Sequence, residues 1–124
     1  MHSRLSTDYF SRFFRGALEG HLTCVRGSIK LPLTVFYRDQ IFQLDSDKTI
    51  EDFFSPFQAL TQGSQTWRMD TEILEFNEEG ENMECYFVEV QLHGDESFRN
   101  ANMSAKLYVR RADDASSVEL IEFF

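Results

Sequence analysis

The stretch TWRMDTEILEF, residues 66–76, decides the fold. Apolar and polar residues alternate along it, and a period of two is typical of a β-strand with one buried face. One face is carried by Trp67, Met69, Thr71 and Ile73. After Ile73 the apolar residues are Leu74 and Phe76, so the alternation changes from odd-numbered to even-numbered positions. This change predicts a β-bulge near Ile73, which would curve a long strand.

Before this strand the apolar period is mostly helical. Residues spaced three and four apart form a stripe over Phe10, Phe13, Phe14, Ala17 and Leu18. This spacing predicts a helix capped by Ser6 or Thr7 and ended by Gly20, with His21 continuing the stripe towards the interior. A second, short helix is predicted from Leu22 to Gly27.

A hairpin and a third helix fill the gap up to residue 66. The β-branched and aromatic run 31–37, the turn Arg38-Asp39 and the return 40–44 predict the hairpin. Asp45 or Ser46 caps a helix whose apolar stripe is Ile50, Phe53, Phe54, Phe57 and Leu60. Pro56 removes a backbone bond inside that helix, so a kink, or a break and restart, is expected there, with the end at Gly63.

Three further strands follow, over residues 82–92, 102–111 and 117–123, with a hairpin turn at 77–81. Helices followed by antiparallel strands predict an α+β fold, a strongly curved antiparallel sheet packed against N-terminal helices, in a single domain spanning 1–124. The run Cys85-Tyr86-Phe87-Val88 is apolar on both faces. Such a strand needs cover on both sides, so we expect helices on one face and a second copy of the chain on the other.

Composition narrows the classes of function. Phe accounts for 13 residues, against 4 Tyr and 1 Trp, so a Phe-rich core is expected. The net charge of −9 argues against a nucleic-acid partner, which needs clustered Lys and Arg. No apolar run is long enough to cross a bilayer. The two cysteines, Cys24 and Cys85, lie far apart, which favours free thiols and a cytoplasmic location.

Three segments resemble the nuclear transport factor 2-like superfamily, and within it the SnoaL-like and ketosteroid isomerase branch. They are FFRGALEG at 13–20, LPLTVFY at 31–37, and LYVRR at 107–111 followed by VELI at 118–121. The resemblance implies a cone-shaped, cystatin-like fold with an internal hydrophobic pocket and a homodimer formed through the sheet. Functions in that superfamily range from isomerases, cyclases and dehydratases to association domains, so the fold does not assign an activity.

The isomerase chemistry of that family needs a general base and an oxyanion hole made of a Tyr and a protonated Asp. Tyr9 matches the family's helical tyrosine by its spacing from Gly16. The first strand carries no acid before Asp39, and Lys106 or Leu107 stands where the oxyanion aspartate falls. No catalytic residue is therefore assigned. The candidates for lining the pocket are Tyr9, Phe13, His21, Phe36, Trp67 and Glu89.

No metal or other cofactor is expected. His93-Gly94-Asp95-Glu96 is the one local group of metal-ligating types, and a polar loop of this kind is usually solvated. Three hypotheses remain open: binding of a small hydrophobic or aromatic molecule, a cyclase, isomerase or dehydratase-type enzyme using His21, Tyr9 and Glu89, or a non-catalytic association module.

Overall fold

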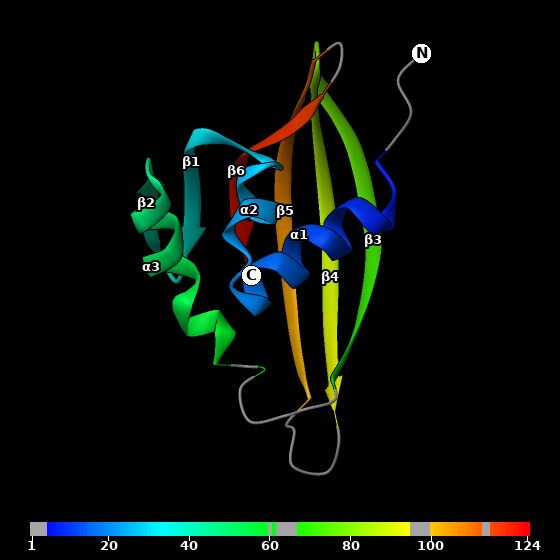
Figure 1. Ribbon diagram of the computed structural model, residues 1–124. Helices are drawn as coiled ribbons and strands as arrows, with labels where there is room; N and C mark the ends of the chain where they lie inside the picture. The colour runs from blue at the N-terminus through cyan, green and yellow to red at the C-terminus, as the bar shows by residue number, and fades with distance from the viewer. Residues whose placement is uncertain (1–4, 60, 62–66, 95–99, 113–114) are drawn as a thin grey trace.

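The computed structural model describes residues 5–59, 61, 67–94, 100–112 and 115–124. Three helices lie on one face of a curved sheet (Figure 1). The helices are α1 (Thr7–Glu19), α2 (Leu22–Arg26) and α3 (Asp47–Gln58). The strands are β1 (Ile29–Tyr37), β2 (Gln40–Leu44), β3 (Trp67–Gly80), β4 (Met83–Gly94), β5 (Ala101–Arg111) and β6 (Ser116–Phe123). The predicted α+β fold is confirmed.

The six strands form one sheet in the order β2-β1-β6-β5-β4-β3. Every neighbouring pair is antiparallel except β1 and β6, which run parallel. The parallel pair differs from the antiparallel sheet that the sequence predicts. It arises because the N-terminal hairpin joins the sheet along β6, the last strand of the chain, and such a long-range pairing leaves no local pattern.

The predicted bulge in β3 is confirmed. Ile73 pairs with Val88 and Glu75 pairs with Phe87, so Leu74 is the extra residue. The extra residue returns the following apolar side chain to the helix-covered face, where the Phe76 ring lies 5.0 Å from that of Tyr86. The turn that follows is tighter than the predicted 77–81, because β3 continues to Gly80 and β4 begins at Met83.

α1 ends as its sequence predicts, at a left-handed Gly20 with φ of 77°. The chain then turns into α2, which packs closely on α1. A Cβ atom at Gly16 would lie 3.0 Å from the Cβ of Cys24, so a glycine at this position permits the close approach. Because the helix stops at Glu19, the stripe does not extend to His21. That residue is the N-cap of α2, and its side chain is 64% exposed rather than directed inward.

α3 begins with the predicted Ser46 cap. The Ser46 hydroxyl accepts from the backbone N–H of Thr49, and the Thr49 hydroxyl accepts from the backbone N–H of Ser46. This reciprocal pair is a capping box. The helix continues through Pro56 and ends at Gln58, two residues later. Its end is therefore earlier than predicted, and Gly63 and Leu60 lie outside the described residues.

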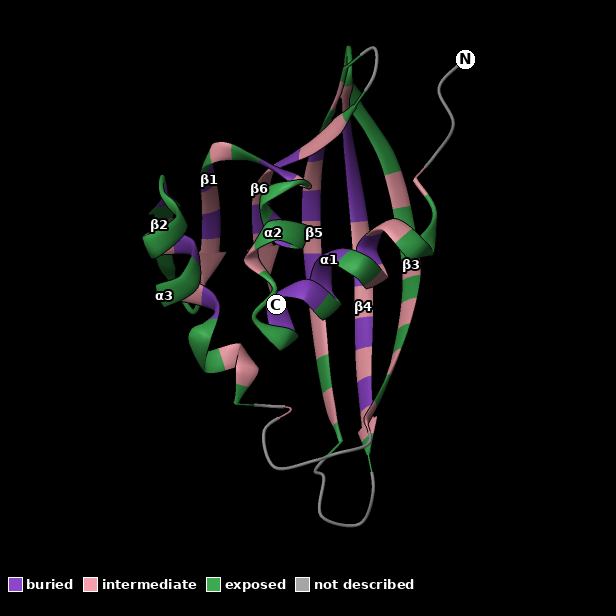
Figure 2. Ribbon diagram, viewed as in Figure 1, coloured by how far each residue is buried: buried purple, intermediate pink, exposed green. Residues whose placement is uncertain are grey.

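The core fills the space between the helices and the sheet. Buried positions alternate with partly exposed ones along β4 and β5, as Figure 2 shows. The helix-covered face of β4 is formed by Glu84, Tyr86, Val88, Val90 and Leu92. Phe10 and Phe13 from α1 are fully buried against this face. Among the described residues, no helix has the length and apolar character needed to cross a membrane.

Candidate functional site

The six predicted pocket residues lie in four separate places. Phe13 is fully inside the core, where its ring meets those of Phe14 and Phe54 edge-on. Tyr9 and His21 share a surface groove between α1 and α2. Trp67, at the start of β3, is half-buried, with the Arg15 guanidinium 4.7 Å from its ring centroid.

Phe36 and Glu89 do not line the interior, which corrects the prediction. Phe36 alternates with the buried Val35 on β1, and Glu89 alternates with the buried Val88 and Val90 on β4. Both side chains therefore point to the sheet face opposite the helices. Glu89 accepts a hydrogen bond from Gln91 Nε2 there, at 3.0 Å. For Phe36 no local pattern distinguishes the two faces, because β1 is apolar on both, whereas Glu89 and Gln91 alternate with Val88, Val90 and Leu92 and so mark the polar face of β4.

The acid–base set Tyr9, His21 and Glu89 is not brought together. The Tyr9 hydroxyl lies 3.2 Å from the Ser28 carbonyl oxygen and 3.4 Å from that of Ser116, so it ties α1 to the chain around β1 and β6. Burial raises its pKa above 10. The His21 Nδ1 lies 3.9 Å from Glu19 Oε1, at the surface. A proton relay through these three residues is therefore not formed.

An aromatic surface lies at the end of the sheet where β1 and β6 finish and α3 ends. We call it the aromatic mouth, and it consists of Tyr37, Phe42, Phe53, Phe57 and Phe123. All five side chains are half-buried. The Phe57 and Phe123 rings stack with centroids 5.5 Å apart, and the Tyr37 ring lies 5.7 Å from Phe57 and 5.9 Å from Phe123. This is a continuous wall of ring faces and edges that stays open to solvent.

Two adjoining grooves of about 460 Å³ each follow the aromatic mouth and share Tyr37, Arg38 and Phe57. The first groove also contacts Phe42, Asp52, Phe53 and Pro56. The second also contacts Asp39, Ala101, Asn102, Met103, Phe123 and Phe124. Together we call them the mouth groove. Its volume and its aromatic rings, together with the polar side chains of Arg38, Asp39, Asp52 and Asn102, are compatible with a small-molecule site.

None of the five residues of the aromatic mouth was among the predicted pocket residues. Phe53 and Phe57 belong to the apolar stripe of α3, which was read as core, and Tyr37 and Phe123 close predicted strands. The turn Arg38-Asp39 was correctly predicted, and it places Tyr37 against α3. The missed signal is that aromatic residues end both β1 and β6, since the parallel pairing of these strands puts Tyr37 and Phe123 side by side.

A buried polar network lies on β4 and β5, away from the mouth groove. The Tyr86 hydroxyl donates to Glu84 Oε1 at 3.0 Å and accepts from the Leu5 backbone N–H at 2.9 Å. Arg111 Nη1 lies 3.6 Å from the same Glu84 oxygen. Burial and the adjacent Glu84 carboxylate raise the pKa of Tyr86 to about 12. The network fastens the start of the described chain to the sheet.

The residues described include no group of three His, Cys, Asp or Glu side chains positioned to hold a metal ion. His93 Nε2 instead lies 3.2 Å from Asp70 Oδ2 on the neighbouring strand β3. The other acids of the predicted loop group, Asp95 and Glu96, lie outside the described residues.

Comparison with known protein families finds no match, and neither does comparison with curated proteins. Solved structures match over nearly the whole chain. A candidate ketosteroid isomerase from Shewanella frigidimarina is 10% identical, with a TM-score of 0.69 over 94% of this chain and 92% of that one.

Two structures of unknown function agree. A cystatin-like protein from Nostoc punctiforme is 11% identical, with a TM-score of 0.66 over 94% of this chain and 84% of that one. A nuclear transport factor 2-like protein from Shewanella baltica is 12% identical, with a TM-score of 0.61 over 94% and 87%. Identities this low establish architecture and not activity. The helices, the sheet and these likenesses agree that the chain adopts the nuclear transport factor 2-like, cystatin-like fold.

Proposed function

We propose that this protein binds a small hydrophobic or aromatic molecule in its mouth groove, as a SnoaL-like binding protein. The observation that carries the proposal is the half-buried ring wall of Tyr37, Phe57 and Phe123, which borders a groove instead of being sealed in the core. Large ring faces left partly open to water are favourable contacts for a flat apolar ligand.

The enzyme alternative has less support. A cyclase, isomerase or dehydratase needs an acid and a base that face the same ligand. In the mouth groove the charged residues are Arg38, Asp39 and Asp52, and histidine is not part of its lining. The three acid–base residues suggested by the sequence lie elsewhere, so binding is the function we favour.

Binding is tested with N-phenyl-1-naphthylamine, a neutral aromatic dye that fluoresces in apolar surroundings. Wild-type protein is expected to bind it saturably. Phe57→Ala should weaken binding at least fivefold, because it removes a ring that contacts both Tyr37 and Phe123. Fluorescence titration gives both dissociation constants, and a loss of about 1 kcal/mol corresponds to this factor.

Phe76→Ala is the matched control, since this half-buried ring lies against Tyr86, away from the mouth groove. It should leave the dissociation constant within twofold. Phe57→Leu keeps apolar volume at the site, so its dissociation constant should lie between those of Phe57→Ala and wild type. Circular dichroism checks that each variant is folded. Equal weakening by Phe57→Ala and Phe76→Ala would overturn the assignment of the site.

We also propose that a second copy of the chain covers the sheet face opposite the helices. Phe36, Phe87 and Leu120 lie on this face, and the Phe87 ring contacts that of Phe124 at 5.5 Å. Phe124 is 64% exposed. Its neighbour Lys106 has its ammonium 5.8 Å from that ring centroid. These apolar side chains support a homodimer formed through the sheet, and the same dimer is compatible with a non-catalytic association module as the alternative function.

Sedimentation equilibrium tests the dimer. The wild-type mass should be twice the 14.5 kDa of one chain at micromolar concentration. Phe87→Glu places a charge in the proposed interface and should produce monomers. Thr23→Glu, on the exposed side of α2, should not. A wild-type protein that sediments as a monomer contradicts the proposal.

A reducing compartment such as the cytoplasm suits this protein, and we propose that location. Cys24 is exposed and Cys85 is buried, and both are free thiols. Burial raises the pKa of Cys85, which keeps that thiol protonated and unreactive.

A further inference from the structure

Arg38 occupies an unusual backbone position between the two parts of the mouth groove. It and Asp39 form the two-residue turn between β1 and β2, with φ of 50° and 64°. Hairpin turns of this kind favour Gly or Asn at both central positions, because a side chain is strained at positive φ. A strained position held by a long cationic side chain, next to a groove, points to a role for that side chain.

The Arg38 guanidinium lies over the Tyr37 ring, 5.2 Å from its centroid. In the part of the chain that the structure describes, no carboxylate lies within ion-pair distance of it. A guanidinium held on an aromatic face keeps its charge and its N–H donors available for a planar anion. Among the described residues, Arg38 therefore makes no ion pair of its own, although Asp39 follows it in the same turn.

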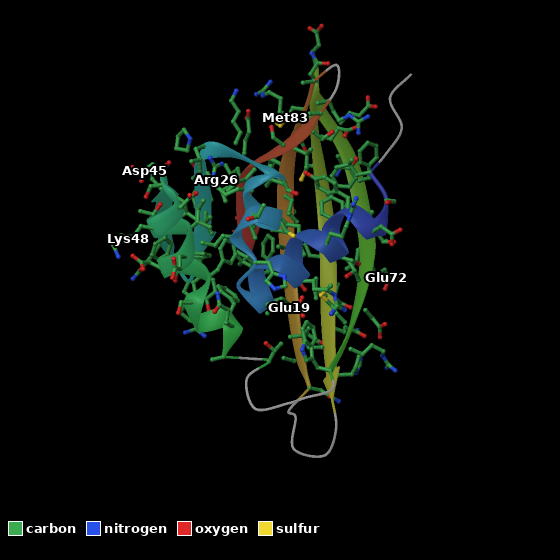
Figure 3. All side chains as sticks on the ribbon, in the orientation of Figure 1. Glu19, Arg26, Asp45, Lys48, Glu72 and Met83 are labelled. Atoms are coloured by element: carbon green, nitrogen blue, oxygen red, sulfur yellow. The ribbon has the colours of Figure 1, made fainter. Side chains whose placement is uncertain are left out.

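Of the described residues that line the mouth groove, Arg38 is the one basic residue. The acid of the first groove, Asp52, is paired with Lys48 at 3.4 Å, and Figure 3 shows Lys48 on the outer side of α3. Asp39 lines the second groove and opposes the charge of Arg38 there. The aromatic wall and the single guanidinium together match a flat apolar body that ends in an anion.

We propose that the mouth groove selects aromatic molecules that carry a carboxylate or sulfonate, and that Arg38 is the residue that determines this specificity. The inference rests on the proposed binding function and adds the charge of the ligand. The ring wall holds the apolar body, and the Arg38 fork donates hydrogen bonds to the two oxygens of the anion.

Two dyes with the same aromatic framework distinguish the proposed binding function from the proposed anion selectivity. N-phenyl-1-naphthylamine is neutral, and 8-anilinonaphthalene-1-sulfonate adds a sulfonate to the same framework. Wild-type protein is expected to bind the sulfonate at least as tightly as the neutral dye. Arg38→Gln should lower the affinity for the sulfonate dye, relative to the affinity for the neutral dye, about tenfold. Arg38→Lys keeps a positive charge but lacks the paired N–H donors of the guanidinium. Its affinity for the sulfonate dye should lie between those of wild type and Arg38→Gln.

The control is Asp39→Asn, which removes a negative charge from the same turn, whereas Arg38→Gln removes a positive one. It should bind the sulfonate at least as tightly as wild type. Added salt should weaken binding of the sulfonate dye to wild-type protein and have little effect on its binding to Arg38→Gln. If neither dye binds wild type, the binding function itself fails. If the neutral dye binds but Arg38→Gln leaves the ratio of the two affinities unchanged, the binding function stands and the charge selectivity is overturned.

Discussion

Replacing Arg111 with methionine is expected to lower the free energy of unfolding by about 3 kcal/mol, the largest effect we predict for a single side chain. Arg111 is the cation beside Glu84, whose side chain is only 5% exposed. Without it, the carboxylate keeps the Tyr86 hydroxyl as a donor but stays buried with an uncompensated charge. Urea unfolding at pH 7 measures the loss.

Two variants show whether the buried charge is the cause. Arg110→Met, one residue away, breaks the ion pair with Glu119 at 2.8 Å, but Arg110 is 45% exposed, so a loss below about 1 kcal/mol is expected. The double variant Glu84→Gln with Arg111→Met removes both charges and should recover part of the stability lost in Arg111→Met. If the double variant is instead less stable than Arg111→Met alone, the charge argument is wrong.

Stability is expected to fall as the pH rises from 10 to 12, and Tyr86 should contribute about 2 kcal/mol of that fall. The folded protein raises the pKa of this phenol to about 12, from 10.0 in the unfolded chain. A raised pKa means that the fold favours the protonated form. The contribution is therefore complete below pH 10 and is lost progressively as the pH rises through 12.

Unfolding curves of wild type and Tyr86→Phe between pH 8 and 12 test this. The variant should be less stable than wild type at pH 8, because it loses the bonds to Glu84 and Leu5, and the difference should shrink towards pH 12. Tyr108→Phe, at a half-exposed position, should change the pH dependence less. A constant difference between wild type and Tyr86→Phe across this range contradicts the assigned titration.

Local patterns were sufficient for most of the fold. The helical stripe of α1, the Ser46 cap, the hairpin turn at Arg38-Asp39 and the bulge after Ile73 all follow from residues close in sequence. The parallel pairing of β1 with β6 was not predictable in this way, because it joins segments more than 80 residues apart. α3 also ends earlier than predicted, because an apolar stripe indicates which face of a helix is buried but not at which residue the helix ends.

The candidate site was harder to predict for the same reason. The sequence indicated an aromatic interior, but Phe13 packs deep in the core while Phe57, in a similar stripe, reaches the surface. Which of two equivalent rings stays open depends on where the helix lies relative to the strand ends. His21 was predicted to point inward as a continuation of the α1 stripe. Gly20 ends α1 before this residue, so the helical spacing no longer applies to it.

The most direct test of the account uses the methionine methyl groups as reporters, observed by NMR with 13C-methyl labelling. Met103 lines the mouth groove, whereas Met83 lines a groove beside β1 and β6 at the far end of the sheet (Figure 3). Adding N-phenyl-1-naphthylamine should shift the Met103 methyl signal along the same saturation curve as the dye fluorescence and leave Met83 unchanged. A saturating dye that shifts Met83 and not Met103 would show that the ligand binds elsewhere.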